Sequence, residues 1–262
     1  NQKIKMRKKL LITILLAASG ISSYATTFMC VKNNDGQIVK FDVNDVEEVI
    51  FEDKTDSVDT TSSINKCVDL NLPSGTIWAT CNIGATKPEE YGDYFAWGET
   101  SPKDVYDWNT YKWGLSIWDE SENSWSYDSL LKYNSVDSLV TLLPEDDAAT
   151  ANWGSDWRMP TADEVNELID NCEYSWAEVN GVKGVKFTAS NGNFIFFPAA
   201  GALSDEGDIY PDGTLGCYWS SSLFGIDHNF NAYDLGISEF MVFSAGFSRK
   251  IGFSVRAVRA TK

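Results

Sequence analysis

The clearest pattern of apolar and polar positions predicts a short amphipathic helix that begins near Thr161. Apolar residues recur at helical spacing over residues 165–169, and Glu164 stands three residues after Thr161, as in a capping box. Just before it, residues 153–159 hold two tryptophans and a methionine that need burial, with Arg158 between them in need of a fixed acceptor. The pattern predicts an aromatic anchor loop that leads into this helix.

Most of the remaining pattern is typical of short strands. Segments 68–84 and 93–97 mix short apolar runs with turn residues, and segments 181–187 and 193–197 predict two strands joined at an Asn-Gly turn. Residues 202–217 are rich in Gly and Asp and predict a loop. The mixture predicts an α+β fold with two small, mostly antiparallel sheets, one or two short helices and long loops.

The N-terminal pattern is that of a secretory signal peptide in residues 1–25. Basic residues after Met6, the expected start, precede an apolar run over residues 10–18, and small residues follow up to Ala25, the expected cleavage site. The alternative is a membrane anchor, but the run is short for a bilayer. We therefore expect a secreted, periplasmic or cell-surface protein without a membrane span after cleavage.

A small β unit is expected between residues 26 and 54. Strands at 28–32 and 37–41 flank Asn34-Asp35-Gly36, a hairpin turn signal, and residues 49–51 predict a third strand. Residues 55–65 predict a linker rich in Asp, Ser and Thr, and residues 66–262 form the main domain.

Composition narrows the possible partners. Hydrophobic residues make up 43% of the 262, enough for a packed core, and the formal net charge is −17. Such an acidic surface repels phosphate backbones, so a nucleic-acid partner is not expected.

Cysteines and clustered acids each allow two interpretations. Export permits disulfides among Cys30, Cys67, Cys81, Cys172 and Cys217, and a Cys81–Cys172 pair is the first expectation; the alternative is buried free thiols. No Cys-x-x-Cys motif is present, so a zinc site has no support. The acids of 144–147 could bind calcium or could stabilise a helix start; their pattern is an incomplete calcium site, and no metal is predicted.

An aromatic stretch without clear periodicity, residues 104–134, predicts a long ordered loop. One interpretation is a platform that stacks on a sugar or another flat ligand, formed by Trp108, Trp113, Trp118 and Trp125. The other is a loop that packs its aromatic residues onto the domain as a secondary core.

An ordered series of motifs carries a family resemblance. It comprises "VDLNLPSGTIWATCNIGA" at 68–85, "PEEYGDYFAWGET" at 88–100, "YKW" at 111–113, "PEDDAATANWGSDWRMPT" at 144–161 with "WRMPTADEVNEL" continuing from 157, "NGNFIFFPAAG" at 191–201, "GCYWSSS" at 216–222 and "GFSVRAVR" at 252–259. Together these motifs resemble the FISUMP (major paralogous domain) family, in the formylglycine-generating-enzyme-like branch of the C-type lectin fold. The resemblance covers residues 67–259 and implies a C-type-lectin-like fold. Formylglycine-generating enzymes use a cysteine pair near the C-terminus, whereas here only Cys217 lies close, so that activity is not implied.

The resemblance also directs attention to residues 223–251, between "YWSSS" and "GFSVRAVR". In diversity-generating retroelement targets with a C-type lectin fold, hypervariable positions lie in a similar C-terminal segment. It implies a ligand-binding, diversified face that comprises Phe224, Ile226, Asp227, His228, Asn229, Phe230, Asn231, Tyr233, Glu239, Phe240, Phe243, Phe247 and Arg249. The alternative is a pair of ordinary strands with inward phenylalanines.

Enzyme chemistry has little support in the sequence. His228 is the sole histidine, so a multi-histidine metal site is excluded, and a Ser-His-Asp triad would have to use this residue of the predicted binding face. We expect an exported, non-enzymatic protein without a cofactor that binds a protein or carbohydrate ligand at the cell surface. The alternatives are a carbohydrate-active or modifying enzyme that uses carboxylates, and a purely structural surface protein.

Overall fold

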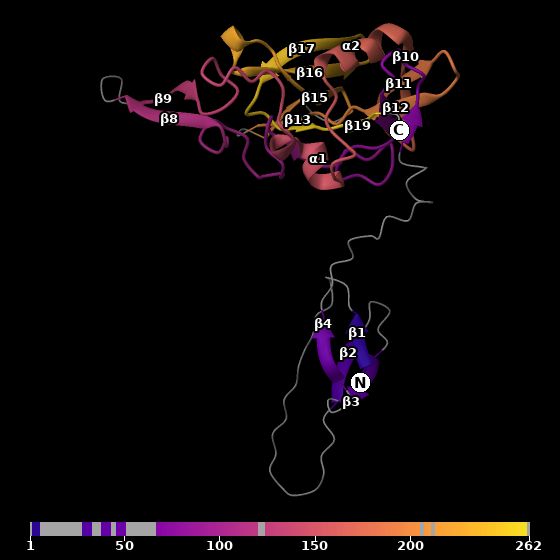
Figure 1. Ribbon diagram of the computed structural model, residues 1–262. Coiled ribbons are helices and arrows are strands. Elements are labelled where there is room, and N and C mark those ends of the chain that lie inside the picture. The colour runs from indigo at the N-terminus through magenta and orange to yellow at the C-terminus, as the bar shows by residue number, and fades with distance from the viewer. Residues whose placement is uncertain are drawn as a thin grey trace, which may run out of the picture. The chain divides into compact units, whose positions relative to one another are not determined.

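The computed structural model describes most of the main domain and four strands of the N-terminal region. The described residues are 2–5, 28–32, 38–42, 46–50, 67–119, 124–204, 207–210 and 213–260. The chain divides into two compact units, Asn1–Thr60 and Thr61–Lys262. Figure 1 labels helices and strands of each unit.

The N-terminal unit is built from four short strands. They are β1 (Gln2–Lys5), β2 (Phe28–Lys32), β3 (Ile38–Asp42) and β4 (Val46–Ile50). Strands β2 and β3 pair antiparallel with Val31 opposite Val39, as the predicted hairpin requires. The predicted third strand corresponds to β4, which starts three residues earlier than expected and pairs in parallel with β1. The predicted turn at 34–36, linker at 55–65 and most of the predicted signal peptide lie outside the described residues.

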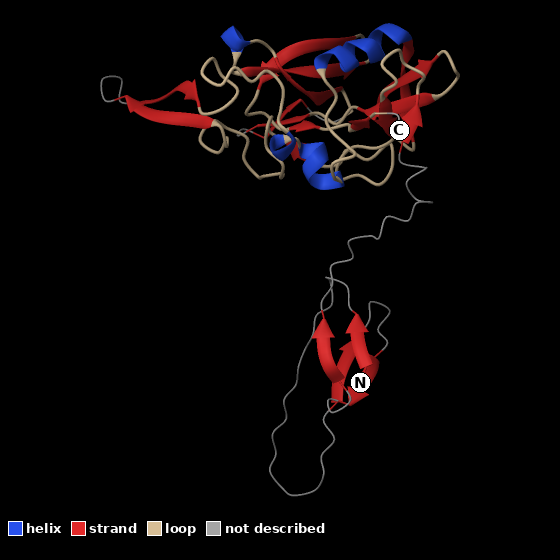
Figure 2. Cartoon of the chain, viewed as in Figure 1, coloured by secondary structure: helices blue, strands red, loops and turns tan. Residues whose placement is uncertain are grey.

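The main unit is dominated by strands, with two short helices (Figure 2). In chain order it contains β5 (Cys67–Asp69), β6 (Ile77–Ala79), β7 (Tyr94–Phe95), β8 (Gly114–Asp119), β9 (Ser124–Leu130), η3 (Pro144–Asp146), α1 (Ala148–Trp153), α2 (Ala162–Asn171), β10 (Cys172–Val179), β11 (Val182–Ala189), β12 (Phe194–Pro198), β13 (Ala202–Ser204), β14 (Gly207–Tyr210), β15 (Leu215–Leu223), η4 (Ile226–His228), β16 (Asn231–Ser238), β17 (Val242–Ser248), β18 (Phe253–Ser254) and β19 (Val258–Arg259). The α+β class predicted from the sequence is confirmed.

A five-stranded sheet, ordered β17-β16-β15-β18-β7, forms the centre of this unit. It is antiparallel apart from the β15–β18 pair. Two three-stranded antiparallel sheets, β10-β11-β12 and β19-β6-β5, and the two hairpins β8-β9 and β13-β14 complete the described strands. The expectation of two sheets was therefore wrong. The turns and crossings that interrupt the strands divide the strand content among several small ladders.

Helix α2 begins as the sequence predicts. The hydroxyl of Thr161 accepts a hydrogen bond from the Glu164 amide, and the Glu164 carboxylate accepts one from the Thr161 amide, which completes the capping box. Arg158 finds its fixed acceptor in the same carboxylate, with N–O distances of 2.6 Å to both oxygens. Thr76, immediately before β6, donates a further bond at 2.7 Å. One carboxylate thus ties the helix, the anchor loop and a distant strand together.

The two larger of three apolar clusters form most of the core. One surrounds Trp97, Trp219 and Phe253, and the last two rings stack 4.3 Å apart. The other surrounds Trp78 and Phe197 and receives the apolar face of α2. Because both clusters draw residues from β15, the central sheet separates and supports them.

Three segments differ from their prediction. Within the expected loop at 104–134, β8 and β9 form a hairpin with Trp118 opposite Trp125. The expected loop at 202–217 contains the β13–β14 hairpin and the start of β15. Strand β10 was not predicted, although Cys172, Tyr174 and Trp176 alternate with polar residues; it is an edge strand, and this pattern covers only its first five residues.

The predicted disulfide is not formed. Cys172 carries a buried free thiol, and so does Cys217. The expected Cys81–Cys172 pair is therefore wrong, and burial explains Cys172 and Cys217 as apolar core residues. Within the part of the chain that the structure describes, no helix is long and apolar enough to cross a membrane.

Candidate functional site

The predicted binding segment, residues 223–251, folds into the end of β15, the η4 turn and the β16–β17 hairpin. Asp227 and His228, on η4, are exposed. Around them, six of the predicted residues are half-buried: Phe224, Ile226, Asn229, Phe230, Asn231 and Tyr233. Ile226 also packs against the apolar core. The segment therefore presents a polar tip on an aromatic base.

Phe224 anchors this tip to the sheet. Its ring centroid lies 4.8 Å from that of Tyr233 and 6.1 Å from that of His228. The ring covers Gly246 of β17, where an added Cβ would come within 2.4 Å of it. Gly246 is thus required for the close approach of Phe224, and η4 is held over the strands by ring packing.

Phe230 connects η4 to the aromatic stretch of residues 104–134. Its ring packs edge to face against Trp108 with 5.4 Å between centroids, and Trp108 packs in the same way against Tyr111 at 5.6 Å. Trp108 is half-buried. The structure thus joins two predicted segments, more than 100 residues apart in the chain, into one surface.

Arg249 lies beneath this surface and not on it. Its side chain is fully buried, with 0% exposure, so its assignment to an exposed binding face was wrong. The guanidinium donates to four oxygens, those of the Tyr111 hydroxyl and the Asn229, Lys132 and Tyr133 carbonyls, over 2.8–3.2 Å. A buried charge is tolerated because its donors are satisfied. Arg249 therefore fixes η4 and the aromatic stretch relative to each other.

Four further predicted residues do not belong to the η4 surface. Glu239 and Phe240 lie in the β16–β17 turn, at the opposite end of the hairpin from η4, and Phe240 is 91% exposed. Phe243 covers Gly236 on β16. Phe247 packs into the core with its ring 5.2 Å from that of Phe253. The alternative of inward phenylalanines is correct for Phe247, and the thirteen predicted residues do not form a single face.

The predicted tryptophan platform is only partly described. Trp113 donates to the Gly98 carbonyl at 3.1 Å, and the Lys112 and Lys132 ammonium groups lie 4.3 Å and 5.1 Å from its ring. Trp108 and Trp113 pack against the same small apolar cluster, which is the secondary-core interpretation for these two residues. Trp118 and Trp125 are paired across the β8–β9 hairpin, but their side chains lie outside the described part.

The acidic cluster at 144–147 is engaged in internal bonds. Asp146 is buried and accepts from Lys112, Lys132 and the Tyr133 hydroxyl over 2.5–2.9 Å. Burial opposes the charged form of Asp146, but these donors outweigh it and lower its pKa. Asp147 caps α1 through the Thr150 amide, and burial raises its pKa. Across the described residues, no group of three or more His, Cys, Asp or Glu side chains is arranged to hold a metal ion.

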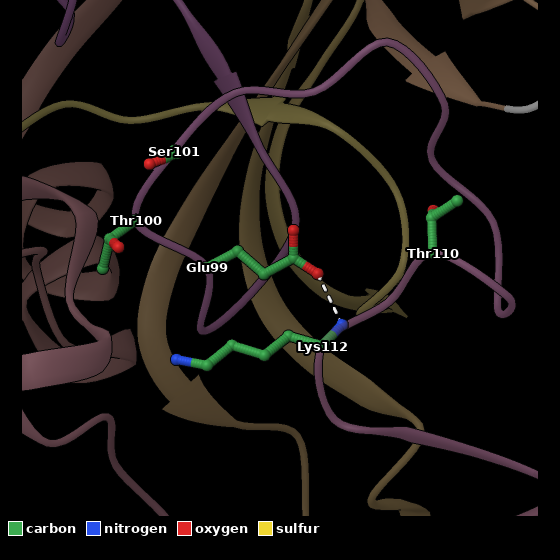
Figure 3. A pocket seen from close by; sticks show the side chains of 5 residues that line it. All are labelled: Glu99, Thr100, Ser101, Thr110 and Lys112. Atoms are coloured by element: carbon green, nitrogen blue, oxygen red, sulfur yellow. Dashed lines mark hydrogen bonds between the residues drawn. The ribbon is translucent and has the colours of Figure 1, made fainter.

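A shallow groove of about 270 Å³ lies beside the aromatic stretch. It is lined by Glu99, Thr100, Ser101, Thr110 and Lys112, and Figure 3 shows Thr110 on one side of Glu99 and the other two hydroxyl residues on the opposite side. The Glu99 carboxylate accepts from the Lys112 amide at 2.8 Å and from Lys103 at 2.9 Å. The groove offers hydroxyl and ammonium groups within a few residues of Trp108.

One unusual residue was not identified from the sequence. Asp234 on β16 is 2% exposed, and one of its carboxylate oxygens has no hydrogen-bond partner among the described residues. Burial raises its pKa to about 8. The other buried residues of β16 are apolar or glycine. The position of Asp234 among them is the one sequence signal that could have indicated its burial.

Neither family models, nor curated proteins, nor solved structures include a match to this chain.

Proposed function

We propose that this protein is a non-enzymatic ligand-binding protein whose binding surface is formed by η4 and the Trp108 region. The observation that carries the proposal is the Trp108–Phe230 contact over buried Arg249. It supports a preformed surface, since the rings and the loop are fixed before any ligand arrives. Preorganisation of this kind lowers the entropic cost of binding.

The chemistry of the surface supports a polar ligand with a flat apolar face. Asp227 and His228 supply exposed hydrogen-bonding groups, and Phe230 and Trp108 supply partly exposed rings. The groove at Glu99 extends the polar part with three hydroxyl groups. A carbohydrate or a protein loop with an aromatic or sugar-like face fits this combination.

We also propose a C-type-lectin-like fold of the FISUMP type and export to the cell surface. The ordered motifs from residue 68 to 259 and the mixed, strand-rich architecture support the first proposal. The signal-like pattern of residues 1–25 supports the second. Diversification of the segment 223–251 belongs to the same proposal. Burial limits the positions that can vary: Phe247 and Arg249 are needed in the interior of the domain, whereas Asp227 and His228 tolerate change.

A glycan array tests the binding function. The wild-type chain is expected to bind a defined subset of glycans, and a variant with Asp227, His228 and Phe230 changed to Ala is expected to lose that binding while keeping its melting temperature within a few degrees. A control with Asp163, Glu173 and Phe194 changed to Ala removes exposed side chains from other elements and is expected to bind as the wild type does. Equal loss in both variants, or unfolding of the first alone, would count against the proposed surface.

Population sequencing tests diversification separately. The coding stretch for residues 218–259 is sequenced across many cells of one population. Changes at adenine positions confined to codons of exposed residues support a diversified binder. A uniform stretch would leave a fixed binding surface and would remove diversification from the proposal.

A further inference from the structure

Strand β17 is an open edge of the central five-stranded sheet. It pairs with β16 on one side only, and Figure 1 shows it along the upper border of the main unit. Its seven residues, Val-Phe-Ser-Ala-Gly-Phe-Ser, contain no charge and no proline, and its ladder with β16 runs without a bulge. Soluble proteins normally protect such edges with charges, prolines or bulges. By contrast, the edge strand β10 carries Glu173 and Glu178.

The hydrogen-bonding groups of this edge point outward in a regular order. The Ser238 amide bonds to the Met241 carbonyl at one end of the hairpin, and the Arg249 amide bonds to the Phe230 carbonyl at the other. In an antiparallel ladder, every second residue bonds to the neighbouring strand. Between these two points, the amide and carbonyl groups of Ser244 and Gly246 therefore point away from β16. Outside the β16–β17 ladder, no backbone hydrogen bond among the described residues reaches them.

The sequence of β17 is nearly symmetric about its central residue, Ala245. Read outward from Ala245, Ser244 matches Gly246 in small size, and Phe243 matches Phe247. In an antiparallel pair of two such strands with a two-fold axis through Ala245, all seven residues overlap. Two Ser244–Gly246 pairs then exchange hydrogen bonds; both paired side chains are small, and the ring of Phe224 lies over each Gly246.

The flanking residues complement each other in the same arrangement. The turn at residues 239–241 of one copy reaches the end of β17 of the other, where Lys250 lies. Glu239 is thereby brought near an opposite charge. Phe240 and Met241, which are 91% and 55% exposed, gain apolar cover from the partner. The uncharged edge also lets two chains of formal charge −17 approach where their mutual repulsion is least.

We propose that two copies of this chain associate through antiparallel pairing of β17, with the two-fold axis at Ala245. The pairing joins two five-stranded sheets into one continuous sheet. An interface of this kind is isologous, because the same patch serves both copies. The pairing brings residues 239–241 of each copy to the end of the other copy's hairpin that carries η4, so these residues flank the proposed binding surface, while the pairing itself does not depend on that surface.

Cysteine cross-linking of the full chain tests this geometry. In the proposed register Ala245 opposes itself in a non-hydrogen-bonded pair, with about 4.5 Å between Cα atoms, which lies within the range for a disulfide. The Ala245→Cys variant is expected to form a covalent dimer under mild oxidation well above the wild-type background. Val136→Cys, at a side chain that is 91% exposed, controls for random collision.

Sedimentation of the full chain supplies a second, independent readout. The wild type is expected to show a concentration-dependent shift toward twice the chain mass, and Ser244→Pro is expected to remove the shift. Proline at this position deletes an outward amide and no bond to β16. A melting curve shows whether this variant is folded; if it is not, the cross-linking of Ala245→Cys decides alone.

Two results would overturn the pairing. One is a wild-type chain that stays monomeric while Ala245→Cys cross-links no more than Val136→Cys. Another is a dimer without the Ala245→Cys cross-link, since the copies would then associate through a different surface.

Discussion

At the scale of single residues, Glu164 is the clearest example of one side chain that holds several elements together. Burial alone would raise its pKa, but bonds from Arg158, Thr161 and Thr76 outweigh burial and lower the pKa to about 2. The pKa of Glu164 is lower in the folded state than in the unfolded state. The contribution of Glu164 to stability is therefore present above about pH 4.5 and is lost as the pH falls toward 2.

The variant Glu164→Gln is therefore expected to lose stability at neutral pH. The carbonyl oxygen of the new amide can still accept from the Thr161 amide, but the amide cannot neutralise Arg158, and we expect a loss of about 2 kcal/mol in the free energy of unfolding. Chemical denaturation at pH 7 measures it. Asp163→Asn removes an exposed charge from the same helical turn, and a loss as large in that control would assign the effect to the helix dipole.

For Asp234 we expect the opposite pH dependence of folding stability. Burial raises its pKa to about 8, so between pH 4 and pH 8 the folded state holds a proton that the unfolded state releases. Its contribution to stability therefore falls as the pH rises through this window, by up to about 1.4 kcal/mol per pH unit.

Asp234→Asn is expected to remove this part of the pH dependence of stability. The variant and the wild type should differ little near pH 4, and the variant should be the more stable of the two at pH 8. Denaturation at a series of pH values gives the two slopes. Parallel curves for the two proteins would show that Asp234 does not titrate in this window.

The residue scale also shows which features of the site were readable from the sequence. The Thr161–Glu164 capping box was predictable because its partners are three residues apart. The acceptors of Arg249 were not, because they lie 20 to 138 residues away and three of them are backbone carbonyls. Nothing in an arginine's neighbouring sequence distinguishes a buried anchor from a surface ligand contact.

At the scale of elements, Arg249 connects the end of β17 to η4 and to the aromatic stretch. Arg249→Lys retains the charge, but the compact ammonium cannot reach four oxygens at once. We expect a loss of at least 3 kcal/mol and faster proteolysis between residues 104 and 134, since the loops lose their shared anchor.

Limited proteolysis and thermal denaturation measure the two effects. Lys183→Met, at an exposed position on β11 that lies outside the proposed pairing, serves as the control and is expected to behave as the wild type does. Loss of stability in Arg249→Lys without a change in the cleavage pattern would contradict the anchoring role.

The elements also show why two segments were wrongly predicted as loops. Over residues 124–127 serine alternates with aromatic residues, which is a strand pattern, but it was hidden by the surrounding polar residues. Strands β13 and β14 are only three and four residues long. Short ladders depend on their tertiary partners more than on local propensity. The helix and the strands at 182–189 and 194–198 had longer patterns and were predicted correctly.

At the scale of the whole molecule, the chain consists of two units whose contacts are largely internal to each. All three apolar clusters of the main unit consist of residues from position 68 onward. The described residues of the first unit form short two-stranded pairs, which are marginal alone. The stability of the main unit is therefore expected not to depend on residues 1–60.

A chain of residues 61–262 should consequently melt at the temperature of the main transition of the full protein. Calorimetry of both proteins makes the comparison, and Glu164→Gln should lower the transition by the same amount in each, because its partners all lie within the main unit. A markedly lower transition in the shorter chain would mean that the first unit packs on the main one and stabilises it. Equal transitions would instead leave the first unit free to serve another role, independent of the binding surface.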